Sequence, residues 1–455
     1  METKNKKLID SKIFWIFIIG LVLRLILLFS QQDMWHDASF SVLYSEMPLE
    51  YIVDSNDVHP PLYYIYLKAV LLFSDDELWI RFSSIMLWGA FFYWFNKFLF
   101  RNFNGMRRYI SLLFITISPT FVYYSLEPRN YILGLVFVAI NLYSFFEINK
   151  GIDKRTLFVV SSILMLYTHY FTVFVLIVEA FFIIIKQKDK IKNYVVDFIF
   201  IWAVSLPVLF YIFRTLPKLE AFWFKDITLW SFFSTISFQF WFPDTVTAIN
   251  IICLIMFGVL LLFINKRNMF LVALFFVPII FTWMISQVHQ IYHHRFFLFY
   301  APAIYILIGD GMQRFYYSEK FFKNVFMILL FFLSIGVFLT SNARMIDALP
   351  DEIHDSQKFL KEHYIDENET TFIVHVSSFS STPYNYYFRD YNVLNFLKTN
   401  LTERQLFTAG GSVIPDWSII NNTIDFKQYY LVTHNVMLDE KQIWNEGGLR
   451  IYDIQ

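Results

Sequence analysis

Long apolar runs limit what this chain can fold into. A helix needs about 20 consecutive, mostly apolar residues to cross the hydrocarbon core of a bilayer. Runs of this kind lie at 13–31, 79–98, 109–125, 130–148, 156–186, 194–213, 246–264, 269–287, 296–313 and 322–340. They predict an all-α polytopic membrane protein, because a soluble domain would have to hide all of these runs from water.

The composition agrees with this class of protein. Hydrophobic residues make up 57% of the chain and charged residues 16%, whereas soluble domains contain about 45–50% and about 25%. This excludes a disordered chain and a soluble enzyme, and the net charge of −1 offers no attraction for nucleic acid. The single cysteine, Cys253, excludes an intramolecular disulfide and a zinc site built on thiolates.

The distribution of basic residues predicts how the chain crosses the membrane. Four lysines precede the first run, and no small-residue cleavage site follows it, which is typical of an uncleaved signal anchor with a cytoplasmic N-terminus. The stretch 156–186 can cross twice, with an outer turn at 168–170; one long tilted helix is the alternative. The segment 60–74 has 15 residues and opens with two prolines, so we interpret it as an interfacial helix.

These assignments predict 11 spans in the plasma membrane and a C-terminus outside the cytoplasm. The predicted cytoplasmic segments carry 20 Lys and Arg residues and the short outer loops carry 6, which is the asymmetry that the positive-inside rule requires. We assign residues 1–344 to a transmembrane domain. Within it, residues 32–78 form the first extracytoplasmic loop, which contains the interfacial helices.

The composition changes after Thr340. No spanning run follows, and Asp, Glu, Asn and Lys become frequent again. Alternating apolar residues at 371–376 and 428–433 predict strands, and 355–364 reads as a helix. We therefore expect residues 345–455 to form a small extracytoplasmic α/β domain.

Polar and ionisable residues gather at the predicted outer face. All ten histidines fall there, four of them in the C-terminal domain and the others at His36, His59, His169, His289, His293 and His294. The same face carries Asp37, Asp57, Arg81, Glu127, Arg129, Tyr131 and Arg295. Ionisable residues collected at one membrane face indicate a functional site, although outer loops hold polar residues in any case.

The chemistry of these residues allows more than one interpretation. A carboxylate such as Asp37 can act as a general base, or it can cap a helix. Cationic and imidazole groups can hold a phosphate through charge-assisted hydrogen bonds. The structural alternatives are that His59 caps the following helix, that Arg81 pairs with a nearby acid and that Arg129 anchors the chain at the interface.

Two ionisable residues fall inside predicted spans, Arg24 in the first and Glu179 in the sixth. Charged groups are costly in lipid unless they are paired. We interpret both as structural partners of other helices and not as catalysts.

Four passages resemble, in order, the motifs of one enzyme family. Trp-His-Asp at 35–37 is similar to a first-loop Trp-x-Asp-Glu signature, and residues 57–64 resemble a motif with the core His-Pro-Pro-Leu-Tyr-Tyr. Residues 78–84 resemble a Leu-Arg-Leu-Pro-Ser stretch, and residues 123–131 resemble Tyr-Tyr-Ser-Gln-Glu-Ala-Arg-x-Tyr. By these motifs the chain resembles the bacterial glycosyltransferases of families 39 and 83. These are C-type (GT-C) membrane enzymes related to protein O-mannosyltransferases and the aminoarabinose transferase of lipid A.

The resemblance implies a GT-C fold and an activity. Members of the family transfer a sugar from a polyprenyl-phosphate donor on the outer leaflet, usually with inversion, to a glycan, lipid or protein acceptor. It implies that Asp37 is the catalytic base and that His59 lies near the donor phosphate. The full set of predicted donor-phosphate and substrate-binding residues is His59, Arg129, Tyr131, Asp57, Arg81, His169 and Arg295.

The chain departs from the family pattern at two positions. Ala38 stands where an acid usually follows the first-loop Asp, which puts in doubt any role that needs paired carboxylates or a metal there. Ser83 replaces the usual proline. The resemblance implies no certain cofactor; a divalent metal is an open alternative, with Asp57, His59 and His289 as candidate ligands.

Two other functions compete with a glycosyltransferase. A transporter or flippase of lipid-linked glycans should place polar residues near the bilayer midplane, often in related repeats, and this sequence shows no repeat. A non-catalytic envelope assembly factor on the same scaffold stays open because of Ala38.

Overall fold

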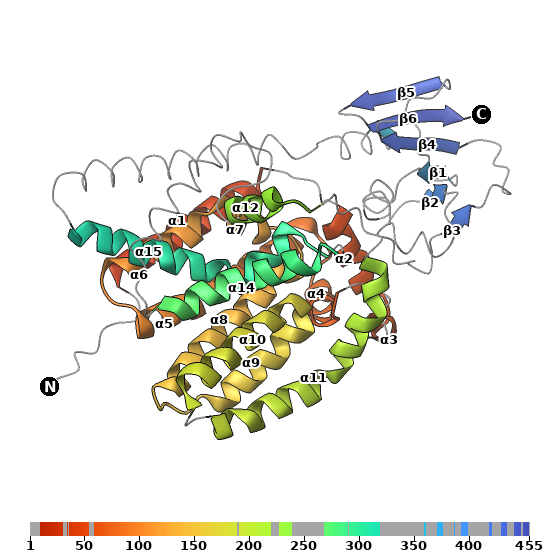
Figure 1. Cartoon of the computed structure of the whole chain (residues 1–455). Helices are drawn as coiled ribbons and strands as arrows, with labels where there is room; N and C mark the ends of the chain where they lie inside the picture. The colour runs from red at the N-terminus through yellow and green to blue at the C-terminus, as the bar shows by residue number, and fades with distance from the viewer. Residues whose placement is uncertain are drawn as a thin grey trace.

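The structure is a computed structural model of the 455-residue chain (Figure 1). It describes residues 10–30, 34, 36–53, 59–188, 191–219, 227–238, 268–289, 291–318, 359–360, 371–375, 386, 393–398, 418–420, 429–434, 441–446 and 449–454. The helices are α1 (Ser11–Leu28), α2 (His36–Glu46), α3 (Leu49–Val53), α4 (Leu62–Leu71), α5 (Glu77–Asn102), α6 (Met106–Ile117), α7 (Pro119–Tyr124), α8 (Asn130–Asn149), α9 (Arg155–Thr168), η1 (Tyr170–Thr172), α10 (Val173–Lys186), α11 (Ile191–Leu219), α12 (Leu229–Phe238), α14 (Met269–Ile285), η4 (His294–Tyr300) and α15 (Ala301–Ser318).

Helix α8 lies inside the helical bundle. It packs along α5 and α9, and 15 of its 20 residues are buried. The 3-10 helix η4 also packs against it. Gly134 of α8 permits this approach, because a Cβ atom there would lie 2.5 Å from the ring of the buried Phe299. The start of α8 and η4 are thereby held together, and both contribute to the candidate site.

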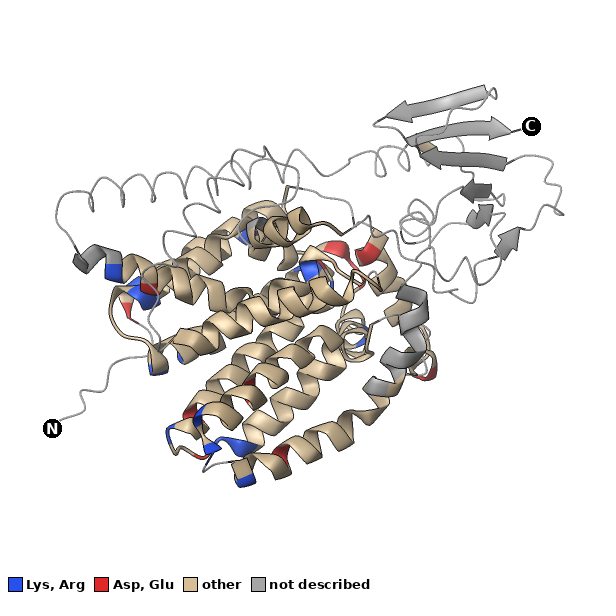
Figure 2. Cartoon of the chain, viewed as in Figure 1, with Lys and Arg blue, Asp and Glu red and all other residues tan. Residues whose placement is uncertain are grey.

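The helices have the composition of membrane-spanning segments. Figure 2 shows charged residues gathered toward the helix ends, with few along the middle of the bundle. Within the described residues, three helices are long and apolar enough to cross a membrane: Ser11–Leu28, Asn130–Asn149 and His294–Arg314. The apolar runs 246–264 and 322–340 lie outside the described residues, so the count of 11 spans stays a prediction.

Two local expectations about the membrane layout agree with the structure. The stretch 156–186 is divided at His169 into α9 and α10, with η1 between them, so it is not one long helix. Helix α4 has 10 residues and is about 15 Å long. It is too short to cross a hydrocarbon core of about 30 Å.

Arg24 connects three helices. It is fully buried, its Nε donates to Ser125 Oγ at 2.7 Å and one Nη donates to the carbonyl of Thr116 at 3.0 Å. The break between α6 and α7 at Pro119 leaves carbonyls such as this one without a helical partner. Its guanidinium carbon also lies 3.9 Å from the centre of the Trp88 ring. The interpretation of Arg24 as a structural partner is therefore confirmed.

Glu179 of α10 is also fully buried. Its carboxylate interacts with the side chain of Asn141 on α8, although neither oxygen has the full geometry of a hydrogen bond with a described residue. Glu179 therefore has a polar partner on another helix, as expected.

Six strands of the C-terminal region form one mixed sheet, in the order β3-β2-β1-β4-β6-β5. The strands are β1 (Thr371–His375), β2 (Val393–Lys398), β3 (Ser418–Ile420), β4 (Tyr429–His434), β5 (Lys441–Glu446) and β6 (Leu449–Ile454). β1 is parallel to β2 and β4, β3 is parallel to β2, and β6 is antiparallel to β4 and β5. Strands β1 and β4 overlap the two predicted strands. Most of the predicted helix at 355–364 lies outside the described residues, so an α/β domain outside the cytoplasm stays a prediction.

One residue links the C-terminal region to the first loop. Tyr386 is 5% exposed and belongs to the same buried cluster as Tyr44 of α2 and Tyr64 of α4. Tyr386 thus packs against the helices of the first loop.

Candidate active site

An ion pair between Asp37 and Arg295 lies at the centre of the site. Asp37 is in the first turn of α2, where the positive end of the helix dipole favours an acid. Arg295 is in η4, and its Nη1 lies 2.6 Å from Asp37 Oδ2. About a fifth of each side chain is exposed, 23% for Asp37 and 21% for Arg295. The pair therefore remains accessible to a substrate.

Arg129 is a second cation beside Asp37. It directly precedes α8 and is buried. Its Nη1 donates to the backbone carbonyl of Asp37 at 3.0 Å and to Ser41 Oγ at 2.9 Å. Ser41 donates in turn to the same carbonyl at 2.8 Å. These bonds fix the first turn of α2 against the start of α8.

Both guanidinium groups keep unused donors. The Nε atoms of Arg129 and Arg295 are buried and have no hydrogen-bond partner among the described residues. Buried donors of this kind are rare in folded proteins and require an explanation. A bound anion such as a phosphate would supply the missing acceptors.

The two cations determine the charge state of Asp37. Burial disfavours the charged carboxylate, but Arg295 and then Arg129 outweigh burial and hold the pKa of Asp37 well below its usual range. Asp37 is therefore ionised at any physiological pH. A carboxylate held so strongly in its charged form is also a weak proton acceptor until one of these cations is engaged elsewhere.

Glu127 has the opposite environment. Burial raises the pKa of Glu127, and the nearby Arg81 offsets this only in part. The pKa values of the two acids of the site are therefore shifted in opposite directions, that of Asp37 downward and that of Glu127 upward. Acids separated in this way often have different chemical roles.

Aromatic and imidazole rings form a wall of the site. The His59 and His169 rings are 5.5 Å apart, and Tyr131 lies 5.8 Å from His169. His169 Nδ1 accepts a hydrogen bond from the backbone of Phe171 at 3.2 Å, so its proton is on Nε2. Burial lowers the pKa of His169 well below its usual value. It is a neutral donor here and not a cation.

The structure brings together six of the eight predicted site residues. Arg129 and Arg295 each bond to Asp37, and the rings of His59 and Tyr131 each contact His169. Arg81 forms an ion pair at 2.9 Å with Glu77, one turn earlier on its own helix, as the structural alternative predicted, and its charge also acts on Glu127. Asp57 lies outside the described residues.

The candidate metal site gains no support from the described residues. No group of three or more His, Cys, Asp or Glu side chains in that part of the chain could hold a metal ion. His289 is exposed at the end of the turn after α14, and Asp57 is not described.

Two residues of the site were not predicted as ligands. Ser41 stands four residues after Asp37, so the helical period places both on one face. Glu127 stands in the same motif as Arg129 and Tyr131, and its burial could not be read from the sequence.

Comparison with known proteins shows which fold these residues adopt. No family model matches the chain, and no curated protein sequence matches it. The crystal structure of ArnT from Cupriavidus metallidurans in the apo state matches with a TM-score of 0.58 and 10% identity over 97% of both chains. The chain has the ArnT fold. ArnT bound to undecaprenyl phosphate matches with a TM-score of 0.55 and 11% identity, again over 97% of both chains. The resemblance to C-type membrane transferases is therefore confirmed at the level of the fold.

Proposed function

We propose that this protein is an integral-membrane glycosyltransferase. It moves a sugar from a polyprenyl-phosphate donor to an envelope acceptor (a glycan, lipid or protein) at the extracytoplasmic face. The observation that carries the proposal is a charged carboxylate, Asp37, beside two guanidinium groups whose Nε donors lack an acceptor among the described residues. The ArnT fold supports it, because one ArnT structure holds undecaprenyl phosphate.

The proposed chemistry is an inverting displacement. The acceptor hydroxyl attacks the anomeric carbon while Asp37 takes its proton. The bond between that carbon and the phosphate oxygen breaks, and the electron pair leaves on the phosphate. Arg295 and Arg129 stabilise the charge of this leaving group, as preorganised donors do for a developing anion.

Donor binding would also activate the base. In the structure Arg295 bonds Asp37 directly and lowers its basicity. A phosphate that competes for Arg295 weakens this pair, so the pKa of Asp37 rises toward its usual value. The base is thereby activated only when the donor is in place.

The other predicted residues have supporting roles in this proposal. His59 and His169 lie close enough to the ion pair to contact the phosphate or the sugar, and Tyr131 contributes a ring to the sugar site. Arg81, near the start of α5, lies beside Glu127 at the edge of the proposed site, and Asp57 stays a predicted ligand.

A lipid analysis tests the proposed function. A strain that lacks this protein should accumulate one polyprenyl-phosphate sugar and lose one envelope glycan, and the wild-type gene should reverse both changes. The accumulated species also names the sugar. An unchanged profile of lipid-linked sugars would argue against a donor of this class.

The proposed topology has its own test. We expect a cysteine placed within 345–455 to be labelled from outside the cell by an impermeant maleimide, because 11 spans put the C-terminus outside. Cys253, the only native cysteine, is first replaced by Ala, and a cysteine at Lys188 serves as the cytoplasmic control. Labelling of the C-terminal cysteine only after lysis would reverse the topology.

A further inference from the structure

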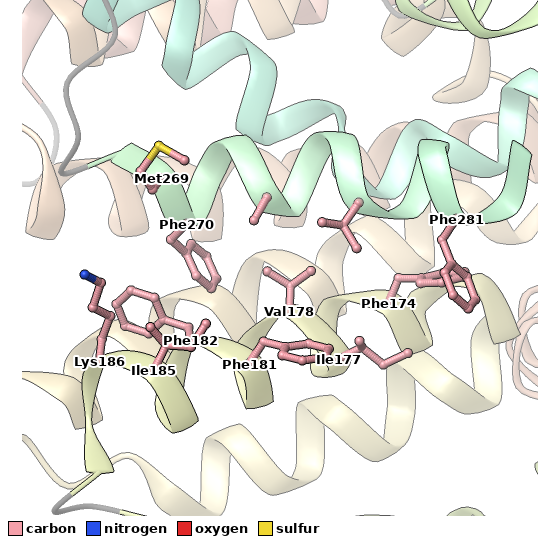
Figure 3. Close-up of a pocket in the computed structure, with 12 residues that line it drawn as sticks. Phe174, Ile177, Val178, Phe181, Phe182, Ile185, Lys186, Met269, Phe270 and Phe281 are labelled. Carbon is pink, nitrogen blue, oxygen red and sulfur yellow. The ribbon is translucent and has the colours of Figure 1, made fainter. Parts of the chain in front are cut away.

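A groove lies between α10 and α14, and the described residues of its lining include none of the candidate site. Its volume is about 540 Å³, within the range of about 300–1,000 Å³ usual for ligand pockets. Figure 3 shows aromatic and aliphatic side chains from both helices along its length. The lining residues are Phe174, Ile177, Val178, Phe181, Phe182, Ile185, Lys186, Met269, Phe270, Ala273, Val277 and Phe281.

The groove has the length of one lipid leaflet. From Phe174 to Lys186 the helix advances 12 residues, or about 18 Å at 1.5 Å per residue. Half of a hydrocarbon core of about 30 Å is about 15 Å. One acyl chain from one leaflet therefore fits along the groove.

The groove is open on the side where lipid would lie. Phe181 is 59% exposed, Ile185 63% and Met269 55%. A contiguous exposed apolar patch marks a surface that another apolar body covers. Around a membrane-spanning helix, lipid chains are such bodies.

The charge at one end of the groove indicates which lipid head group binds there. Among the described residues of the lining Lys186 is the only charged one, and Figure 3 shows its amine at the end of the groove where Met269 also lies. Basic groups beside a pocket between membrane helices favour anionic head groups, and the proposed topology puts this end in the cytoplasmic leaflet.

From these observations we infer that the groove between α10 and α14 binds an anionic phospholipid of the cytoplasmic leaflet, with one acyl chain along the groove and its phosphate on Lys186. The inference rests on the proposed topology, and the choice of this occupant over the donor lipid also rests on the proposed function. The isoprenoid chain of the donor is the less suitable occupant, because its phosphate belongs with Arg129 and Arg295 at the other membrane face.

Two pairs of variants test the site in the full-length protein. Lys186→Gln removes the cation, and Lys188→Gln is its control, because Lys188 is exposed and does not line the groove. Val277→Trp fills the groove at a position that is 37% exposed, and Ile280→Trp adds the same ring at a position on α14 that is 44% exposed and outside the lining.

Each variant is placed in nanodiscs of phosphatidylcholine, with and without phosphatidylglycerol. The lipids that remain bound after transfer to detergent are measured by native mass spectrometry, and thermal unfolding is followed in the nanodiscs. Phosphatidylglycerol should remain bound to the wild-type protein and raise its Tm, because a ligand of the folded state stabilises it.

The four variants should differ in the phosphatidylglycerol that they retain. Lys186→Gln should weaken phosphatidylglycerol binding about fivefold, since one basic residue near an anionic lipid contributes about 1 kcal/mol. Val277→Trp should remove the bound lipid, and both controls should behave as wild type. Equal phosphatidylglycerol retention by Lys186→Gln and Lys188→Gln, or an isoprenoid lipid recovered in its place, would overturn the inference. Cleavage of a polyprenyl-phosphate sugar is measured on the same samples, so a failure of the groove is distinguishable from a failure of the proposed activity.

Discussion

Asp37→Asn is expected to abolish sugar transfer while leaving the protein in the membrane at its normal level. The amide has the size of the carboxylate and can still accept a hydrogen bond from Arg295, which lies 2.6 Å away in the wild type. It cannot take a proton from the acceptor. Loss of a general base lowers a rate by about 10²–10⁴-fold, and the readout is transfer from a labelled polyprenyl-phosphate sugar in washed membranes.

A matched control lies on the same helix. Glu46→Gln removes an exposed carboxylate at the other end of α2 and should leave transfer unchanged. If Asp37→Asn keeps wild-type transfer at equal expression, the general-base assignment is wrong. If Glu46→Gln also loses transfer, the helix as a whole is responsible and not the carboxylate of Asp37.

Arg295→Gln is expected to lower transfer about 10- to 100-fold, since hydrogen bonds to charged groups contribute about 1.5–3 kcal/mol. The substitution should also change the pH dependence of kcat/KM for sugar transfer. Burial raises the pKa of Asp37, and Arg295 is the largest of the charges that lower it. Without Arg295 the pKa of Asp37 rises, so less of the base is ionised at acidic pH and the acid limb of kcat/KM moves to higher pH.

Two further variants show whether the charge of Arg295 has this effect. Arg295→Lys retains the charge but not the bidentate geometry, so activity should fall while the acid limb stays near its wild-type position. Arg314→Gln removes an arginine that pairs with Asp310 at 2.8 Å near the far end of the same helical segment, and it should not move the limb. An acid limb at the same pH in wild type and Arg295→Gln would contradict the electrostatic role of Arg295.

Much of the site could be predicted from the sequence because its residues stand in recognisable motifs. Asp37, His59 and Arg129 stand in short passages whose residue order identifies them, and the hydrophobic periods place those passages at helix ends. The break at His169 was predicted because 31 apolar residues are too many for one crossing. The ion pair of Arg81 with Glu77 also follows from spacing, since residues four apart on a helix are neighbours.

Other parts of the site depend on packing that no local pattern encodes. Asp37 and Arg295 are 258 positions apart in sequence, and they meet because η4 packs against α8 where Gly134 leaves room for Phe299. The opposite environments of Asp37 and Glu127 depend on which cations the fold brings beside each. The groove between α10 and α14 could not be predicted for the same reason. In the apolar runs 156–186 and 269–287 the sequence does not distinguish residues that face protein from residues that face lipid.

The most direct test of the central claim is donor cleavage by the purified protein. The full-length chain in nanodiscs is incubated with polyprenyl-phosphate sugars and an envelope extract as acceptor, and free polyprenyl phosphate is measured by mass spectrometry. We predict that the wild-type protein releases polyprenyl phosphate from one donor and that Asp37→Asn releases none above background. Equal release by the two proteins, or no release by either from any donor, would contradict the account.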